Sequence, residues 1–290
     1  GTFDGVHLGH QSILKKVVEA KENNTYEASL LTFFPHPRMV LQQDTSIKLL
    51  NTIDEKAELL DKFGIDNLII HPFDAAFSNL SAEEFVKEIL IDRLNIHKII
   101  IGHDHRFGKN RTADISDLIL FGKKYGFEVE QINAHEIDEI AISSTKIRKA
   151  LMEGNIQLAN QFLGYSYFIS GKVIEGKKIG RTLGFPTANI QINESYKLLP
   201  NNGVYIVSSE INDILYFGMM NIGNNPTLGE NEQSIEVHYF DMSENIYNKK
   251  LKISILEHIR DERKFNSLSD LQAQLEKDKL FSLNYIQNLK

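Results

Sequence analysis

The sequence predicts an α/β plus β protein. We expect a Rossmann-like first domain with a parallel sheet, then a small antiparallel β-barrel with a terminal helix. The chain has 290 residues, a length that favours two domains over one. Its first half alternates short apolar runs with amphipathic stretches, whereas strands separated by turn signals follow from about Tyr167. The expected domains are therefore 1–165 and 166–290.

Four apolar runs in the first half have the length and composition of buried parallel strands. Helical patterns separate them, two with capping-box spacing at Thr52–Glu55 and Ser81–Glu84. This alternation predicts right-handed βαβ crossovers with helices on both faces of a sheet. No strand precedes Gly1, where such a sheet normally has one, so we expect the first strand and the natural N-terminus to be missing. The four runs are EASLLTFF (27–34), NLIIH (67–71), KIIIG (98–102) and FEVEQIN (127–133).

The second half reads as strands, preceded by two short helices at 144–153 and 156–163 and followed by a helix at 268–289. The strands are predicted at YFISGKVIEG (167–176), FPTANI (185–190), GVYIVSSEI (203–211), ILYFGMMNIG (214–223), SIEVHYF (234–240) and KLKISILEHI (250–259).

Composition excludes several classes of protein. The net charge of −7 argues against general nucleic-acid binding, which needs a clustered basic face. No apolar run is long enough to cross a bilayer. The chain has no Cys, which excludes disulfides and thiol catalysis and fits a reducing cytoplasm. Any phosphate site must therefore be built locally from a few groups.

GTFDGVHLGH (1–10) places His7 and His10 three residues apart at the start of a predicted helix. Backbone N–H groups and the helix dipole favour an anion there. Two imidazoles at this point can stabilise charge that develops on a triphosphate, and Gly9 allows a nucleotide to approach the backbone. Taken alone, H-x-G-H could equally be chance; the preceding FDGV and the sheet context favour a site.

Three further clusters occur in the same half: TFFPHPR (32–38), GHDHRFGKNR (102–111) and ISSTKIRKAL (142–151). The first two follow predicted strand ends, where open parallel sheets bind ligands. The third puts Ser144 and Thr145 at a helix start with Arg148 in its first turn, a combination that suits ATP phosphates. Each cluster also has a structural explanation, since Ser144 or Thr145 could be a helix cap, Asp104 a turn residue and 35–37 a rigid loop.

SGKVIEGKKIGRTLGFPTANI (170–190) combines closely spaced glycines with cations, but lacks the order of a P-loop. Thr187 and Asn189 offer oxygen ligands for a hard cation such as Mg²⁺. A barrel hairpin with ordinary turn glycines explains the same composition. The candidate nucleotide-binding residues of this stretch are Gly176, Lys177, Gly180 and Arg181.

These motifs resemble those of the bifunctional bacterial riboflavin kinase/FMN adenylyltransferases, also called FAD synthetases, along nearly all of the chain. The first-half motifs occur in the family's order. In the second half the resemblance rests on GRTLGFPTANI (180–190), PNNGVY (200–205), NIGNNPT (221–227), IEVHYFD (235–241) and RDERKF (260–265).

The resemblance implies a role for each candidate residue. In the first half, His7, His10, Arg148, Ser144 and Thr145 bind ATP phosphates, and Asp104 positions nucleotide or flavin. In the second half, Thr187 and Asn189 coordinate Mg²⁺–ATP, Glu236 is the general base, and Arg260 and Glu262 belong to a flavin-side loop. His238 shares a face with Glu236 and either orients it or is a satisfied barrel histidine. The sequence departs from the family at His105, usually aromatic, and at Asn248, often glycine.

The implied function is ATP-dependent conversion of riboflavin to FMN and of FMN to FAD in the cytoplasm. The expected partners are riboflavin, FMN, FAD and ATP, with no nucleic acid and no membrane; the sequence does not give the oligomeric state. Two alternatives remain. One is a riboflavin kinase with a weakened or different-substrate nucleotidyltransferase domain, and the other is a non-catalytic flavin-binding regulatory protein.

Overall fold

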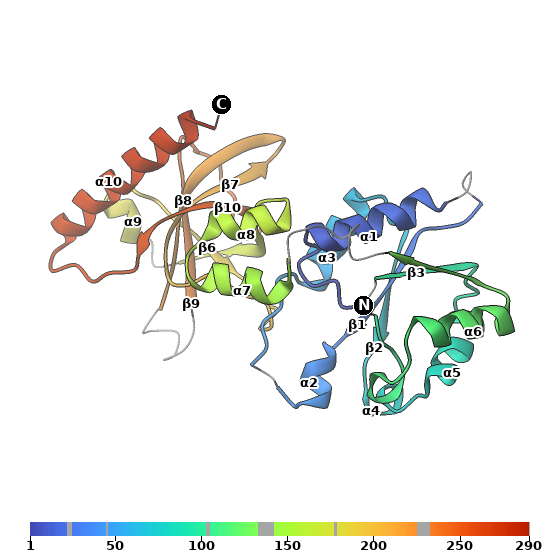
Figure 1. Cartoon of the computed structure of the whole chain (residues 1–290). Helices are drawn as coiled ribbons and strands as arrows, with labels where there is room; N and C mark the ends of the chain where they lie inside the picture. The colour runs from blue at the N-terminus through green and yellow to red at the C-terminus, as the bar shows by residue number, and fades with distance from the viewer. Residues whose placement is uncertain are drawn as a thin grey trace. The chain divides into compact units, whose positions relative to one another are not determined.

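The computed structural model describes residues 1–21, 25–44, 46–102, 105–132, 142–176, 179–224 and 233–289. The chain divides into two compact units, Gly1–Ser143 and Ser144–Lys290 (Figure 1). This division falls before the boundary expected at 165/166. The helices α7 (Ser144–Met152) and α8 (Ile156–Leu163) group with the second unit, because the Asn160 amide donates to Ile255 O at 3.0 Å and Asn201 N donates to Leu151 O at 3.3 Å.

In the first unit all four predicted strands are present and pair in parallel. β1 (Ser29–Phe34) pairs with β2 (Asn67–Pro72), and β3 (Lys98–Gly102) pairs with β4 (Glu128–Ile132). Within the described residues these are two separate pairs and not one continuous sheet. The helices are α1 (Leu8–Glu19), α2 (Pro37–Leu41), α3 (Ile53–Lys62), α4 (Ala75–Ser78), α5 (Ala82–Glu84), η2 (Phe85–Ile91), η3 (Lys109–Arg111) and α6 (Ile115–Tyr125).

Local chemistry sets the helix ends in this unit. Both predicted capping boxes form: Thr52 and Glu55 exchange hydrogen bonds at the start of α3, as do Ser81 and Glu84 at the start of α5. Because α3 connects the parallel strands β1 and β2, it begins at the edge where β1 ends. Ligands bind open parallel sheets at this edge. The start of α3 is therefore placed to contribute to a site.

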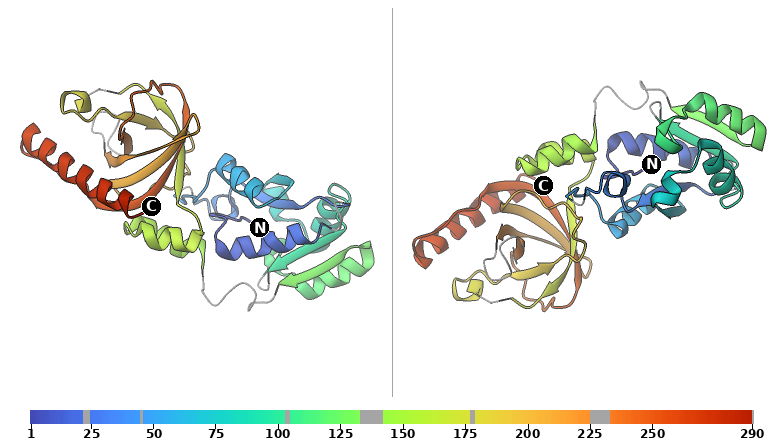
Figure 2. Two further views of the ribbon diagram at one scale, coloured as in Figure 1. Left: turned by 90° about the horizontal axis from the view of Figure 1, so that it is seen from above. Right: turned by 90° about the horizontal axis from the view of Figure 1, so that it is seen from below.

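The second unit is the predicted barrel. Its strands close in the order β10-β5-β6-β9-β8-β7. They are β5 (Phe168–Ile174), β6 (Ala188–Gln191), β7 (Gly203–Ile211), β8 (Ile214–Asn224), β9 (Gln233–Tyr239) and β10 (Lys250–Asp261). A short helix, α9 (Ile179–Thr182), interrupts the glycine-rich stretch, and the terminal helix α10 spans Leu268–Gln287. Figures 1 and 2 show α10 lying along one side of the barrel.

The strands of the barrel have one face inside and one outside. Along β9 the interior residues Ile235, Val237 and Tyr239 are buried, while Glu236 and His238 alternate with them on the outer face. α10 packs on this outer face, where Ile286 joins an apolar cluster with Met219 and Phe240. Glu236 is therefore on the face that the helix partly covers, and not in the barrel interior.

Candidate functional sites

The loop before α1 is fixed to the start of α3 by a buried carboxylate. Asp4 is 2% exposed and accepts hydrogen bonds from the backbone N–H groups of Leu50 at 2.9 Å and Asn51 at 3.4 Å. α1 then begins at Leu8 with His7 as its N-cap, and the His7 side chain makes no capping hydrogen bond. The imidazole is thus left for another role at the helix N-terminus.

His7 and His10 stack on each other, with ring centroids 3.7 Å apart and planes inclined by 19°. Burial lowers the pKa of His7 to about 4, although Asp4 opposes the shift. Burial, together with His7 and Lys56, holds the pKa of His10 well below its usual value. Among the described residues, neither Nδ1 atom has a hydrogen-bond partner. Both imidazoles of the pair are therefore neutral near pH 7.

Lys56 supplies a positive charge close to this pair. It is 4% exposed, and its Nζ donates to Thr2 O at 2.7 Å. Burial lowers the pKa of Lys56, and Asp4 opposes that shift. The sequence motifs gave no indication of this residue, because a lysine in the first turns of an amphipathic helix is normally solvated. Only the contact between the N-terminal loop and α3 shows that Lys56 lies beside the histidine pair.

Aromatic side chains gather where β1 and β2 end. Phe33 lies 5.7 Å from Phe73 and 5.3 Å from Phe77, measured between ring centroids. His105 stacks on Phe107 at 6.1 Å with planes inclined by 19°, so the departure from the family's usual aromatic residue preserves a ring at this position. Asp104 lies outside the described residues. This edge offers flat apolar surfaces of the kind that stack on a planar ring.

The third cluster of the first-half motifs opens α7, as predicted. Ser144 is the first residue of the helix, Thr145 follows, and Arg148 lies one turn later. Thr145 is exposed and Arg148 is half-buried. By contacts these residues belong to the second unit.

The second site is centred on Glu236. In the barrel register Glu236 of β9 lies opposite Asn189 of β6 on one side and opposite Asn221 of β8 on the other. Thr187 Oγ1 donates to Glu236 Oε2 at 3.0 Å. The sequence indicated Thr187, Asn189 and Glu236, and the structure brings all three together. Asn221 was missed, because only the pairing of β8 with β9 places it beside Glu236.

Among the described residues, His238 bonds to the barrel backbone and not to Glu236. Its Nδ1 lies 2.9 Å from Pro186 O, and its ring contacts Phe185 edge-on with centroids 5.1 Å apart. Burial lowers the pKa of His238. The reading as a satisfied barrel histidine is thus the correct one.

Two glycines of the glycine-rich stretch allow close approach of the chain. A Cβ at Gly176 would overlap the Asn189 side chain, and a Cβ at Gly180 would overlap the carbonyl of Phe185. Arg181 is exposed on α9. Lys177 lies outside the described residues. The glycines therefore let this stretch pack directly on the PTAN segment, as a nucleotide-covering loop would need.

The two residues predicted for a flavin-side loop, Arg260 and Glu262, are held by side-chain contacts. Arg260 forms an ion pair with Asp278 of α10, its Nη2 lying 2.8 Å from Oδ2, and Glu262 accepts from Asn202 Nδ2 at 3.2 Å. The second departure from the family is also explained. Asn248 has φ 66°, a left-handed conformation that asparagine tolerates better than most non-glycine residues.

The donor set around Glu236 suits a hard cation. Thr187, Asn189 and Glu236 offer hydroxyl, amide and carboxylate oxygens, the ligand types that Mg²⁺ prefers. Within the described part of the chain, no group of three or more His, Cys, Asp or Glu could hold a metal ion. A cation here would therefore need ligands from ATP phosphates or water as well, which is how Mg²⁺ is normally bound in kinases.

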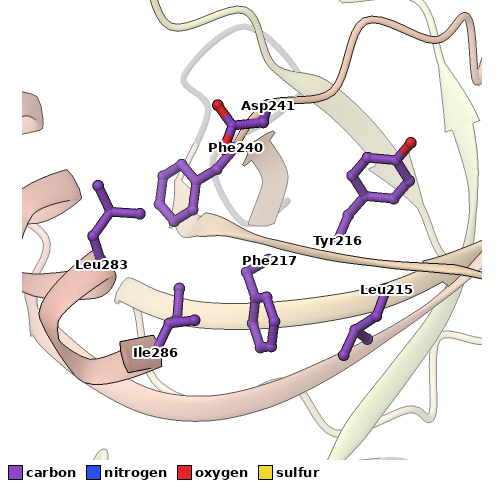
Figure 3. Close-up of a pocket in the computed structure, with 7 residues that line it drawn as sticks. All are labelled: Leu215, Tyr216, Phe217, Phe240, Asp241, Leu283 and Ile286. Atoms are coloured by element: carbon purple, nitrogen blue, oxygen red, sulfur yellow. The ribbon is translucent and has the colours of Figure 1, made fainter. Parts of the chain in front are cut away.

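A pocket of about 270 Å³ lies farther along the same outer face, between the barrel and α10 (Figure 3). It is separated from Glu236 by Met219 and His238, and none of the candidate site residues lines it, although Phe240 and Asp241 end the IEVHYFD motif. Its lining is mainly apolar and consists of Leu215, Tyr216, Phe217, Phe240, Asp241, Leu283 and Ile286.

The fold and the two sites define a two-domain enzyme that handles nucleotide phosphates. Residues 1–146 match the family model described as FAD synthetase, and residues 163–286 match the one described as riboflavin kinase. Relatives named bifunctional riboflavin kinase/FMN adenylyltransferase include one from Buchnera aphidicola subsp. Schizaphis graminum, 42% identical over 96% of this chain and 90% of its own length. One from Bacillus subtilis is 38% identical, covering 100% of this chain and 92% of its own. The chain belongs to the bifunctional riboflavin kinase/FMN adenylyltransferase family.

A solved structure described as a macrolide-efflux protein from Streptococcus pneumoniae has the same fold. The two structures superimpose with a TM-score of 0.86 at 32% sequence identity, and the match covers 98% of this chain and 92% of that one. In the part of this chain that the structure describes, no helix has both the length and the apolar composition to cross a membrane.

Proposed function

We propose that this chain converts riboflavin to FMN at the site around Glu236, and FMN to FAD at the site around His7 and His10. Both reactions use ATP. The observation that carries the kinase is the position of Glu236, between two asparagines in register and hydrogen-bonded to Thr187. A binding protein would not need a half-buried carboxylate in this setting.

In the kinase reaction a neutral alcohol must lose a proton. The ribityl 5′-hydroxyl oxygen attacks the γ-phosphorus of ATP, its proton passes to the Glu236 carboxylate, and ADP leaves. The hydrogen bond from Thr187 holds that carboxylate in orientation. Thr187 and Asn189 would hold Mg²⁺, which supplies neutralisation of phosphate charge when it is bound with ATP. Gly176, Lys177, Gly180 and Arg181 would cover the nucleotide.

In the adenylyl transfer the nucleophile is already an anion. The FMN phosphate attacks the α-phosphorus of ATP and pyrophosphate leaves, so no strong base is required. The neutral imidazoles of His7 and His10 donate hydrogen bonds to phosphate oxygens at the N-terminus of α1, and Lys56 adds positive potential. Positioning and charge stabilisation then account for catalysis.

Further assignments at the two sites rest on the motifs and on the aromatic edge. Ser144, Thr145 and Arg148 bind ATP phosphates, Asp104 positions nucleotide or flavin, and the aromatic edge at Phe33 and Phe73 stacks on the isoalloxazine ring. Arg260 and Glu262 lie on the flavin side of the kinase site. We place the protein in the cytoplasm, with no nucleic acid or membrane as a partner.

Product analysis tests both activities. Purified protein is given riboflavin, ATP and Mg²⁺, and FMN and FAD are separated over time. We expect FMN to appear first and FAD to follow with pyrophosphate. FMN without FAD would favour the alternative in which the first domain has another substrate, and absence of both products would overturn the proposal.

Single substitutions separate the two sites. Glu236→Gln removes the proton acceptor and should lower kcat for riboflavin phosphorylation by about 10²- to 10⁴-fold while FMN adenylylation persists. His10→Ala should do the reverse. If Glu236→Gln left FMN formation unchanged, the role of Glu236 as the general base would be wrong.

A further inference from the structure

Helix α10 carries polar residues on the face that packs against the barrel. Its buried residues are Asp278, Ser282 and Ile286, spaced four apart and therefore on one side of the helix. Asp278 is only 2% exposed. A carboxylate is rarely buried to this extent unless a partner compensates for its lost hydration. The contacts of Asp278 therefore show which part of the barrel this helix holds.

Arg260, near the end of β10, supplies the compensating charge. Its Nε lies 2.9 Å from Asp278 Oδ2 and its Nη2 lies 2.8 Å from the same oxygen, while Gln274 Nε2 donates to Oδ1 at 2.6 Å. Two nitrogens of one guanidinium thus face one carboxylate. Because the guanidinium is planar, this arrangement sets the orientation of Arg260 as well as its distance.

The segment after Arg260 is attached to the same helix. Arg260 Nη1 donates to Asp261 O at 3.1 Å, and Arg263 donates to Gln274. The Phe265 ring lies 5.7 Å from the Arg260 guanidinium and 4.9 Å from that of Arg263. Both arginines therefore connect the segment 260–265 to α10.

Glu262, in the middle of this segment, points back to the barrel beside the kinase site. Its carboxylate lies so close to Gly223 that a Cβ there would overlap it, and Asn221 Nδ2 lies 3.1 Å from the same Cβ position. Asn221 is the β8 residue opposite Glu236. Contacts therefore join Asp278 to Arg260, and the chain itself carries this attachment through Asp261 to Glu262 at the edge of the site.

We propose that Asp278 is a positioning residue for the kinase reaction: through Arg260 it fixes the segment 260–265, and so holds Glu262 at the riboflavin side of the Glu236 site. This role rests on the proposed kinase function. Asp278 contacts no reacting atom, so its loss should disturb riboflavin more than ATP.

The test is steady-state kinetics of Asp278→Asn in the full chain, with riboflavin and ATP varied separately. We expect kcat/KM for riboflavin to fall about 10- to 100-fold, KM for ATP to change less than twofold, and FMN adenylylation to be retained. Arg260→Lys keeps the charge but loses the planar fork, and should give a smaller loss in the same parameter. The effects of Asp278→Asn and Glu262→Gln should be strongly non-additive.

Ser282→Ala is the matched control, because Ser282 is buried on the same helix face but, among the described residues, its Oγ donates only to Asp278 O within α10. It should lower the melting temperature and leave KM for riboflavin unchanged. A purely structural role for Asp278 predicts that Asp278→Asn behaves in the same way. Vmax would then fall while KM for riboflavin and KM for ATP both stay unchanged, and the effects would be additive with those of Glu262→Gln. That result would overturn the proposal. Failure of the wild-type chain to form FMN would instead overturn the proposed function.

Discussion

The pH dependence of folding provides a direct test of the neutral histidine pair. Burial lowers the pKa of His7 to about 4, whereas an unfolded histidine titrates near 6.5. Between these values the unfolded chain binds a proton that the folded chain does not, so the free energy of unfolding falls as the pH falls. The difference between the folded and unfolded pKa values of His7 corresponds to about 3 kcal/mol in the free energy of unfolding. About 2 kcal/mol of this is lost between pH 7.5 and pH 5. His10 contributes in the same direction.

The comparison is between the wild-type chain and His7→Gln, measured by calorimetry at pH 7.5 and pH 5. The substitution removes the titration of His7. Between pH 7.5 and pH 5 the melting temperature of the first unit should therefore fall by about 4–8 °C less in the variant than in the wild type. Carboxylates that titrate in the same window affect both proteins and cancel in the difference. The second unit retains all of its titrating groups and serves as an internal control. Equal pH shifts in the two proteins would refute the assignment of buried neutral imidazoles.

Three other substitutions test separate parts of the structure. Gly176→Ala places a Cβ against the Asn189 side chain and should raise KM for ATP in the kinase reaction about tenfold, with adenylyl transfer unchanged as the control. Lys56→Met should lower kcat/KM for FAD synthesis about 10- to 1,000-fold, because it removes buried positive charge near His10; unchanged FAD synthesis would exclude Lys56 from the site. Asn248→Ala should lower the free energy of unfolding by about 1 kcal/mol, whereas Asn248→Gly should not, as measured by urea unfolding.

Local patterns in the sequence were enough to predict most elements of the fold. Apolar runs predicted β1 to β4, and capping-box spacing predicted the starts of α3 and α5, because these signals depend on residues close together in the chain. The division of the chain at Ser143/Ser144 was not predicted. The apolar residues of helix α8 recur with the same helical period as those of the first-half helices. Only the packing of α8 on β10 places it with the barrel.

The site residues that the sequence missed depend on contacts between distant segments. Lys56 lies near the first candidate site because its Nζ binds Thr2 O and because Asp4 binds the backbone at Leu50, and no local pattern encodes these contacts. Arg260 was predicted from the RDERKF motif as a flavin-side residue, and its ion pair with Asp278 requires the packing of α10 on β10. Motifs identify which side chains matter, whereas tertiary packing decides what each one touches.

The two sites differ in how much of the fold they need. His7 and His10 come from one helix start, so their spacing alone brings the rings together. Glu236 instead depends on the register of three strands, since Asn189 and Asn221 reach it only from β6 and β8. Side chains on a strand alternate between faces, so a one-residue slip of β9 would turn Glu236 into the barrel interior and Val237 outward. The buried interior residues Ile235, Val237 and Tyr239 oppose that slip, and in this sense the apolar core of the barrel fixes the position of Glu236, the proposed general base.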